Sequence, residues 1–176
     1  VENLSSRQYD RIVMYGGRGG AKSDSVAAIA IMESYIDDGV ILCGREIQKT
    51  VADSLHSALV AEIEAKGLTN NFDILNTEIT NKITGARFMF AGFKTNITNI
   101  KSIKKLRVVI AEEAENISQN SWDVIAPTPR YGDVRFYVVF NPRFEDDPTW
   151  QEFIIRSDDR TLLLPIGYQD NPWFPE

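Results

Sequence analysis

Eight consecutive residues, Gly16-Gly17-Arg18-Gly19-Gly20-Ala21-Lys22-Ser23, have the composition of a loop that binds phosphate. Glycine lets backbone N–H groups turn toward an anion without a clash of Cβ atoms. Lys22 can reach the β- and γ-phosphates of a nucleotide, and the hydroxyl of Ser23 can ligate Mg²⁺. An apolar run precedes the loop and a long apolar segment follows it, so the stretch predicts a P-loop between a strand and a helix.

One position departs from the usual P-loop pattern. That pattern has a glycine directly before the lysine, whereas this chain has Ala21 there and Gly20 one place earlier. Alanine is the smallest substitute, so we interpret the loop as a tolerated variant; the alternative is a glycine-rich turn that binds nothing. Asp24 follows in the first turn of the helix. Its charge suits the helix dipole but would repel a phosphate, so we expect its side chain to point away.

Two carboxylates, Glu112 and Glu113, follow the apolar stretch 106–111. A P-loop needs such a partner, because one carboxylate supports Mg²⁺ and the next orients and deprotonates the attacking water. Glu112 stands where aspartate is more usual, and it can ligate directly or through water. The alternative interpretation is a pair of solvated acids at the end of a strand.

Other positions are weaker candidates. The amide of Asn141, after the apolar stretch 135–140, is suited to sense the γ-phosphate or the attacking water, although Asn-Pro pairs also simply form turns. Gln8 and Tyr9 precede the first strand, where they can fold over an adenine or belong to a solvated arm. Arg130 can reach the nucleotide of a neighbouring subunit, but a surface arginine is the default.

Composition limits the classes of function. The 176 residues are enough for one globular domain, and no apolar run is long enough to span a bilayer. The single cysteine (Cys43) and single histidine (His56) argue against a disulfide framework and a His/Cys metal site, so any metal should be a hard cation such as Mg²⁺. The formal charge of −6 predicts weak DNA binding by the isolated chain. The basic residues between 94 and 107 are either a patch that faces DNA or a partner, or a solvated face.

Hydrophobic periodicity predicts an α/β fold with a mainly parallel central sheet flanked by helices. Strands are expected at 11–15, 40–43, 106–111, 135–140 and 161–166, and a β-hairpin insertion at 78–83 and 87–90. Helices are expected at 25–35, 47–66, 114–126 and 146–153.

Six stretches together resemble one family. They are Tyr15-Gly16-Gly17-Arg18-Gly19-Gly20-Ala21-Lys22-Ser23, Cys43-Gly44-Arg45, Ile100-Lys101-Ser102-Ile103, Val108-Val109-Ile110-Ala111-Glu112-Glu113-Ala114, Phe140-Asn141-Pro142 and Tyr168-Gln169-Asp170-Asn171-Pro172-Trp173. In order and spacing, the chain resembles the N-terminal ATPase domain of a phage large terminase subunit, the motor that packages DNA into procapsids. It looks most like the terminases of short-tailed phages of enteric bacteria.

The resemblance implies a RecA-like P-loop NTPase of the class with a catalytic glutamate, with ATP and Mg²⁺ as cofactors. Lys22 and Ser23 would hold phosphate and metal, Glu112 would support the metal, and Glu113 would activate water. Asn141 matches the motif that couples hydrolysis to movement. Arg18, inside the loop, looks like the arginine that these motors place on the γ-phosphate in cis.

The implied partners are double-stranded DNA, the portal protein, the small terminase subunit and a C-terminal nuclease domain of the full-length protein. The implied location is the cytoplasm of the host cell. Residues 1–176 are expected to form a single ATPase domain. Because the family's nuclease domain would follow residue 176, we expect no DNA cleavage by this chain.

Two alternative functions stay open. A P-loop helicase or repair ATPase would unwind DNA and hydrolyse ATP without a procapsid. A regulatory module would bind nucleotide without hydrolysing it, but such a module does not need a water-activating base, so Glu113 argues against it. Turnover separates the regulatory module from the two enzymes, and dependence on a portal separates the two enzymes.

Overall fold

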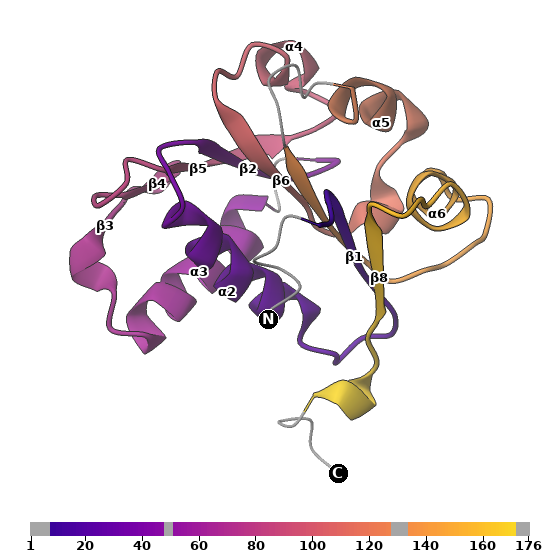
Figure 1. Ribbon diagram of the computed structural model, residues 1–176, viewed down its shortest axis with the longest axis horizontal. Coiled ribbons are helices and arrows are strands. Elements are labelled where there is room, and N and C mark those ends of the chain that lie inside the picture. The colour runs from indigo at the N-terminus through magenta and orange to yellow at the C-terminus, as the bar shows by residue number, and fades with distance from the viewer. Residues whose placement is uncertain (1–7, 48–50, 128–133, 172–176) are drawn as a thin grey trace.

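The computed structural model of the protein describes residues 8–47, 51–127 and 134–171. The described residues form one eight-stranded sheet with helices on both faces (Figure 1). No helix among them is long and apolar enough to cross a membrane.

The strands are β1 (Arg11–Tyr15), β2 (Val40–Arg45), β3 (Phe72–Ile74), β4 (Glu78–Asn81), β5 (Arg87–Gly92), β6 (Leu106–Ala111), β7 (Arg135–Phe140) and β8 (Thr161–Pro165). The helices are α2 (Lys22–Ser34), α3 (Val51–Ala65), α4 (Ile97–Ile100), α5 (Gln119–Ile125) and α6 (Pro148–Trp150), which continues as a π-helical turn over Gln151–Ile155. Short 3₁₀ turns cover Thr69–Asn71, Ala114–Asn116 and Tyr168–Asp170.

The strand order explains how distant residues meet. The sheet runs β3-β4-β5-β2-β6-β7-β1-β8, and every pairing from β5 to β8 is parallel. The two remaining pairings, β3 with β4 and β4 with β5, are antiparallel. Since β7 lies between β1 and β6, the loops that leave the carboxyl ends of these three strands share one edge of the sheet. The predicted mainly parallel α/β sheet with a β-hairpin is confirmed, and this strand order is that of a RecA-like fold.

Alternation along the strands divides the core into two layers. In β1, Ile12 and Met14 belong to the layer that α2 and α3 cover, and Val13 belongs to the layer on the other side, with Trp122 of α5. Successive side chains of a strand point to opposite faces, so a sheet covered on both faces is apolar at every position. Figure 1 shows α2 and α3 on one face, and α4 and α5 on the other.

Several predicted boundaries were wrong. Helix α2 begins at Lys22 rather than residue 25, so the P-loop lysine and serine belong to its first turn. The region predicted as one helix from residue 114 to 126 divides at Ser118, whose side chain accepts the N–H of Ser121 and begins α5. Residues 48–50 are outside the described part, and α3 begins at Val51.

Two short elements were not predicted. Strand β3 has three residues and α4 has four, so neither is long enough to show a period. The predicted basic patch is partly neutralised, because Lys105 pairs with Asp38 and Arg107 pairs with Asp37.

Candidate active site

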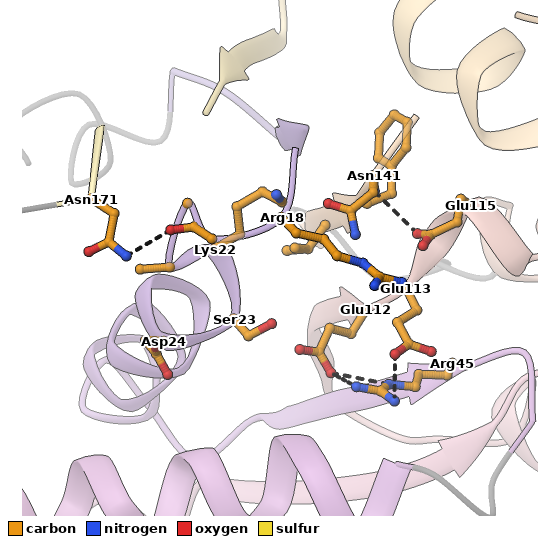
Figure 2. A pocket seen from close by; sticks show the side chains of 15 residues that line it. Arg18, Lys22, Ser23, Asp24, Arg45, Glu112, Glu113, Glu115, Asn141 and Asn171 are labelled. Atoms are coloured by element: carbon orange, nitrogen blue, oxygen red, sulfur yellow. Dashed lines mark hydrogen bonds and ion pairs between the residues drawn. The ribbon is translucent and has the colours of Figure 1, made fainter. Parts of the chain in front are cut away.

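A cavity of about 380 Å³ opens at the carboxyl ends of β1, β6 and β7 (Figure 2). Its lining comes from the glycine loop, the first turn of α2, the end of β2 and the turns that follow β6 and β7. The lining residues are Arg18, Gly19, Gly20, Ala21, Lys22, Ser23, Asp24, Arg45, Glu112, Glu113, Glu115, Val139, Phe140, Asn141 and Asn171.

Most of the residues singled out in the sequence lie together here. Arg18 to Asp24, Glu112, Glu113 and Asn141 all line the cavity, while Gly16 and Gly17 begin the loop and contact Lys22 through their carbonyls. Gln8 and Tyr9 do not line it; Tyr9 is half-buried against the core, and its contact with adenine stays a prediction. Arg130 lies outside the described residues.

Neither the histidine nor the cysteine belongs to the cavity. His56 of α3 hydrogen-bonds the carbonyl of Leu75, 2.8 Å away, and its ring lies against Phe90. Cys43 is fully buried in β2, where burial and then the charge of Glu112 raise the pKa of its thiol. A buried thiol with a raised pKa is a poor nucleophile, so we interpret Cys43 as structural, and the contacts of His56 lie outside the cavity.

The glycine loop is held from behind by the segment that follows β8. A Cβ on Gly16, whose φ is +143°, would lie 2.1 Å from the carbonyl oxygen of Ile166. A Cβ on Gly20 would lie 2.9 Å from Cγ2 of Ile166. The side-chain amide of Asn171 donates to the carbonyl of Gly19 over 2.7 Å. The loop therefore needs glycine at 16 for its backbone conformation and for close packing, and at 20 for close packing.

Ala21 occupies the backbone conformation that the usual glycine would adopt. Its φ of 53° and ψ of 28° are left-handed, and it is the residue before α2. This conformation costs about 1–2 kcal/mol for a residue with a Cβ. The alanine therefore adopts the backbone geometry of a P-loop at a modest energetic cost, which fits the interpretation as a tolerated variant.

Lys22 points back into its own loop. The side chain is almost buried, and Nζ donates to the carbonyls of Gly16 (3.1 Å) and Gly17 (2.5 Å). Burial lowers the pKa of Lys22, and the nearby charge of Glu115 opposes that shift. The ammonium group thus lies where a phosphate held by the loop would contact it.

Arg45, at the end of β2, joins the two predicted carboxylates. Its Nε and Nη2 donate to Oε2 of Glu112 over 3.1 and 2.5 Å, and its Nη1 lies 3.1 Å from Oε1 of Glu113. Arg45 and Glu112 are buried, whereas the side chain of Glu113 is 50% exposed. Sequence reasoning quoted Arg45 within a motif but gave it no role. The available signal was an arginine at the end of an otherwise apolar strand.

We expect Arg45→Ala to destabilise the fold by about 3–5 kcal/mol, because it removes a buried cation that donates two hydrogen bonds to the buried Glu112 carboxylate. For a chain of this size the melting temperature should fall by about 2–4 °C per kcal/mol. Thermal denaturation measures the change. Arg87→Ala is the matched control, since Arg87 makes only an exposed pair with Glu78. If the two substitutions lower the melting temperature equally, the buried pair of Arg45 and Glu112 stabilises the fold no more than an exposed ion pair does.

The backbone of Glu113 is also left-handed, with φ 47° and ψ 42°. Such a conformation is uncommon for a residue other than glycine and concentrates at functional sites. This residue follows directly after the end of β6 and Glu112, and both carboxylates reach Arg45 (Figure 2). The Glu112 side chain is buried, whereas that of Glu113 is half exposed to water.

Asn141 and Glu115 complete the far side of the cavity. The Oδ1 atom of Asn141 is buried and has no hydrogen-bond partner among the described residues. Its backbone N–H donates to Oε2 of Glu115 over 3.3 Å. Glu115 was missed, because sequence reasoning considered only the first two acids of Glu112-Glu113-Ala114-Glu115.

Figure 2 shows how the remaining side chains lie. The hydroxyl of Ser23 points to the side of the cavity that holds Glu112, and Arg18 extends across the opening toward Glu113 and Asn141. Asp24 lines the cavity, and its carboxylate points away from Glu112 and Glu113; its orientation relative to a phosphate stays a prediction.

This geometry agrees with a comparison of the sequence with protein families. The family described as phage terminase large subunit matches residues 8–176. The chain belongs to this family. Among curated proteins, no match is found.

Solved structures of terminases have the same fold. The large terminase of a thermophilic bacteriophage superposes with a TM-score of 0.81 at 14% identity, over 98% of this chain and 44% of that chain. The terminase ATPase domain of Thermus phage P74-26 gives 0.74 at 13% identity, over 93% and 78%. The packaging motor assembly of bacteriophage Phi-29 gives 0.73 at 11% identity, over 98% and 58%. The chain therefore spans less than half of the first of these three proteins.

Proposed function

We propose that this chain is the ATPase unit of a terminase large subunit, which hydrolyses ATP with Mg²⁺ to drive double-stranded DNA into procapsids. One observation carries the proposal: the glycine loop, Lys22, Ser23, two glutamates and Asn141 line the same cavity. The large terminase of the thermophilic bacteriophage was solved in complex with ADP and with ATP-γ-S, and the Phi-29 structure is a genome packaging motor, which supports both parts of the proposal.

The cavity suits a nucleotide. It lies at the N-terminus of the 13-residue helix α2, whose dipole favours a phosphate. Lys22 can exchange its two loop carbonyls for phosphate oxygens. The Oδ1 of Asn141, which has no partner within the described part of the chain, is a buried acceptor that a bound water or hydroxyl group would satisfy.

The donor set also suits Mg²⁺. The hydroxyl of Ser23 and the carboxylate of Glu112 are hard oxygen ligands on the same cavity. No group of three or more His, Cys, Asp or Glu residues that could hold a metal occurs in the described part of the chain. This fits a magnesium ion that takes one or two protein ligands and completes its shell with phosphates and water. When bound, the ion would neutralise charge on the phosphates.

Several side chains that line the cavity have separate roles in the proposed hydrolysis of ATP. Lys22 would hold the phosphates, and Arg18 would stabilise charge on the γ-phosphate. Glu113 is open to water, so its carboxylate can orient a water molecule and take its proton. Glu112, whose carboxylate is held by Arg45, would support the metal ion. Asn141, which lines the same cavity, would couple the state of the nucleotide to the rest of the motor.

The finer parts of the proposal concern the motor in which the unit works. We include the portal protein, the small terminase subunit and a C-terminal nuclease domain of the full-length protein as partners, in the cytoplasm of the host cell. A chain with a net charge of −6 would hold DNA only when it is docked with its other parts. The similarity to short-tailed phages of enteric bacteria stays a prediction.

Steady-state hydrolysis of ATP with Mg²⁺ tests the proposal. We expect Lys22→Ala to weaken ATP binding by about 10- to 100-fold, since a charge-assisted hydrogen bond to phosphate is lost. Lys66→Ala, which changes an exposed lysine directly after α3 that pairs with Glu62, is the matched control and should leave ATP binding unchanged. ATP binding without turnover in the parent chain would favour a regulatory module. If Lys22→Ala binds ATP as tightly as the parent chain, the proposal that the nucleotide binds in this cavity is wrong.

A further inference from the structure

Glu115 is the third acid of the site, and its surroundings differ from those of the other two. It lies on the 3₁₀ turn Ala114–Asn116, directly after β6, and lines the cavity. Its side chain is only 5% exposed. A carboxylate this buried needs polar partners, and among the described residues one hydrogen bond and one ion pair reach it from the loop after β7.

Those contacts connect two neighbouring loops. Oε2 of Glu115 accepts the backbone N–H of Asn141 over 3.3 Å, and Oε1 lies 3.8 Å from Nη2 of Arg143. Arg143 also donates from Nη1 to Oδ1 of Asn116 over 3.1 Å. The turn that carries Glu113 is therefore tied to the loop that carries Asn141, at the backbone and at the side chains.

The hydrogen bond to Glu115 fixes the backbone of Asn141, whose side-chain oxygen is not held by any described residue. The Oδ1 of Asn141 has no partner among the described residues, so its side chain is not fixed by a bond of that atom. What orients Asn141 is its backbone, and the carboxylate that holds this backbone is two residues from Glu113.

We propose that Glu115 is a positioning residue, which holds the loop after β7 so that the amide of Asn141 keeps a fixed place opposite Glu113. The proposal rests on the proposed ATPase function. Glu115 acts through Asn141 and not on the nucleotide itself. An acceptor atom in the right place is what the role requires, so glutamine should replace glutamate and alanine should not.

The contact itself is tested without nucleotide, by NMR measurement of amide exchange in the parent and in Glu115→Ala. The amide of Asn141 should exchange about tenfold faster or more in the variant, as expected for the loss of a hydrogen bond to a charged group. Glu115→Gln, which keeps an acceptor oxygen, should restore slow exchange. An unchanged rate at Asn141 in Glu115→Ala overturns the proposal, whatever the turnover.

The consequence for catalysis is tested by ATP turnover. Glu115→Ala should lower kcat by about 10- to 100-fold with little change in KM, and Glu115→Gln should retain most of the activity. Arg143→Ala keeps the bond between Glu115 and Asn141. It removes the half-exposed ion pair with Glu115 and an exposed hydrogen bond to Asn116, so kcat should fall by about fivefold at most. If Glu115→Gln is as impaired as Glu115→Ala, the charge matters rather than the position, and the proposal fails.

A double variant separates an indirect role from an independent one. Glu115→Ala combined with Asn141→Ala should be no slower than Asn141→Ala alone, because both substitutions remove the same function. If the reductions in kcat caused by the two single substitutions multiply in the double variant, Glu115 acts independently of Asn141 and the proposal is overturned. A parent chain that does not turn over would count against the ATPase function, and the exchange measurement would still decide whether Glu115 holds Asn141.

Discussion

Replacing Arg18 with alanine is expected to lower kcat for ATP by about 10³–10⁵-fold while ATP still binds, if Arg18 acts as an arginine finger in cis. The reason is electrostatic. A guanidinium group over the γ-phosphate stabilises charge that is greatest in the transition state, so its loss affects kcat more than binding. Arg18 is exposed, belongs to the glycine loop and extends across the cavity toward Glu113 (Figure 2).

Two further arginine substitutions should be measured beside Arg18→Ala. Arg18→Lys keeps the charge but loses the planar fork, so it should recover only part of the rate. Arg130→Ala examines the other candidate arginine. If Arg18→Ala keeps the parent's kcat and Arg130→Ala loses it, the catalytic arginine is Arg130. Arg87→Ala, on the antiparallel side of the sheet, should behave as the parent.

Glu113→Gln should reduce kcat by about 10²–10⁴-fold, the usual contribution of a general base. Glutamine has the same shape but accepts a proton poorly, so ATP binding should stay within a fewfold of the parent. Single-turnover hydrolysis and equilibrium binding of ATP separate the two quantities. The buried Arg45–Glu112 pair is left in place, so the melting temperature should change little.

A neighbouring acid gives this prediction a clear alternative. If Glu113→Gln turns over like the parent and Glu115→Gln does not, the base is Glu115, and both its positioning role and the assignment of Glu113 are wrong. Glu64→Gln, which removes one exposed acid from α3, controls for the change in net charge.

Local sequence predicted the parts of the site that are contiguous. The glycine loop, Lys22, Ser23, Glu112 and Glu113 follow apolar strands directly, and their chemistry is readable from residue type and spacing. The parallel sheet followed from the alternation of apolar runs with helical segments. The position of β7 between β1 and β6 is a long-range property, and it is what brings Asn141 into the cavity.

The parts that were missed depend on contacts between distant segments. Arg45 and Glu112 are 67 positions apart in the chain, and Asn171 and Gly19 are 152 positions apart. A polar residue at the end of an apolar strand looks the same whether it meets solvent or a buried partner. Similarly, nothing local shows that Glu115 faces Asn141 rather than water.

The packing behind the glycine loop has a consequence for the entropy of binding. Ile166 and Asn171 already contact Gly16 and Gly19, so the loop does not have to become ordered when a phosphate arrives. Fixing one residue of a free loop costs about 1–2 kcal/mol, and a loop that is held in advance avoids that cost for each of its glycines. The contact between the glycine loop and Ile166 also has a consequence for the segment after β8. Because Ile166 lies against Gly16 and Gly20, we expect a shift of the phosphate-binding loop to be transmitted to the segment that follows β8.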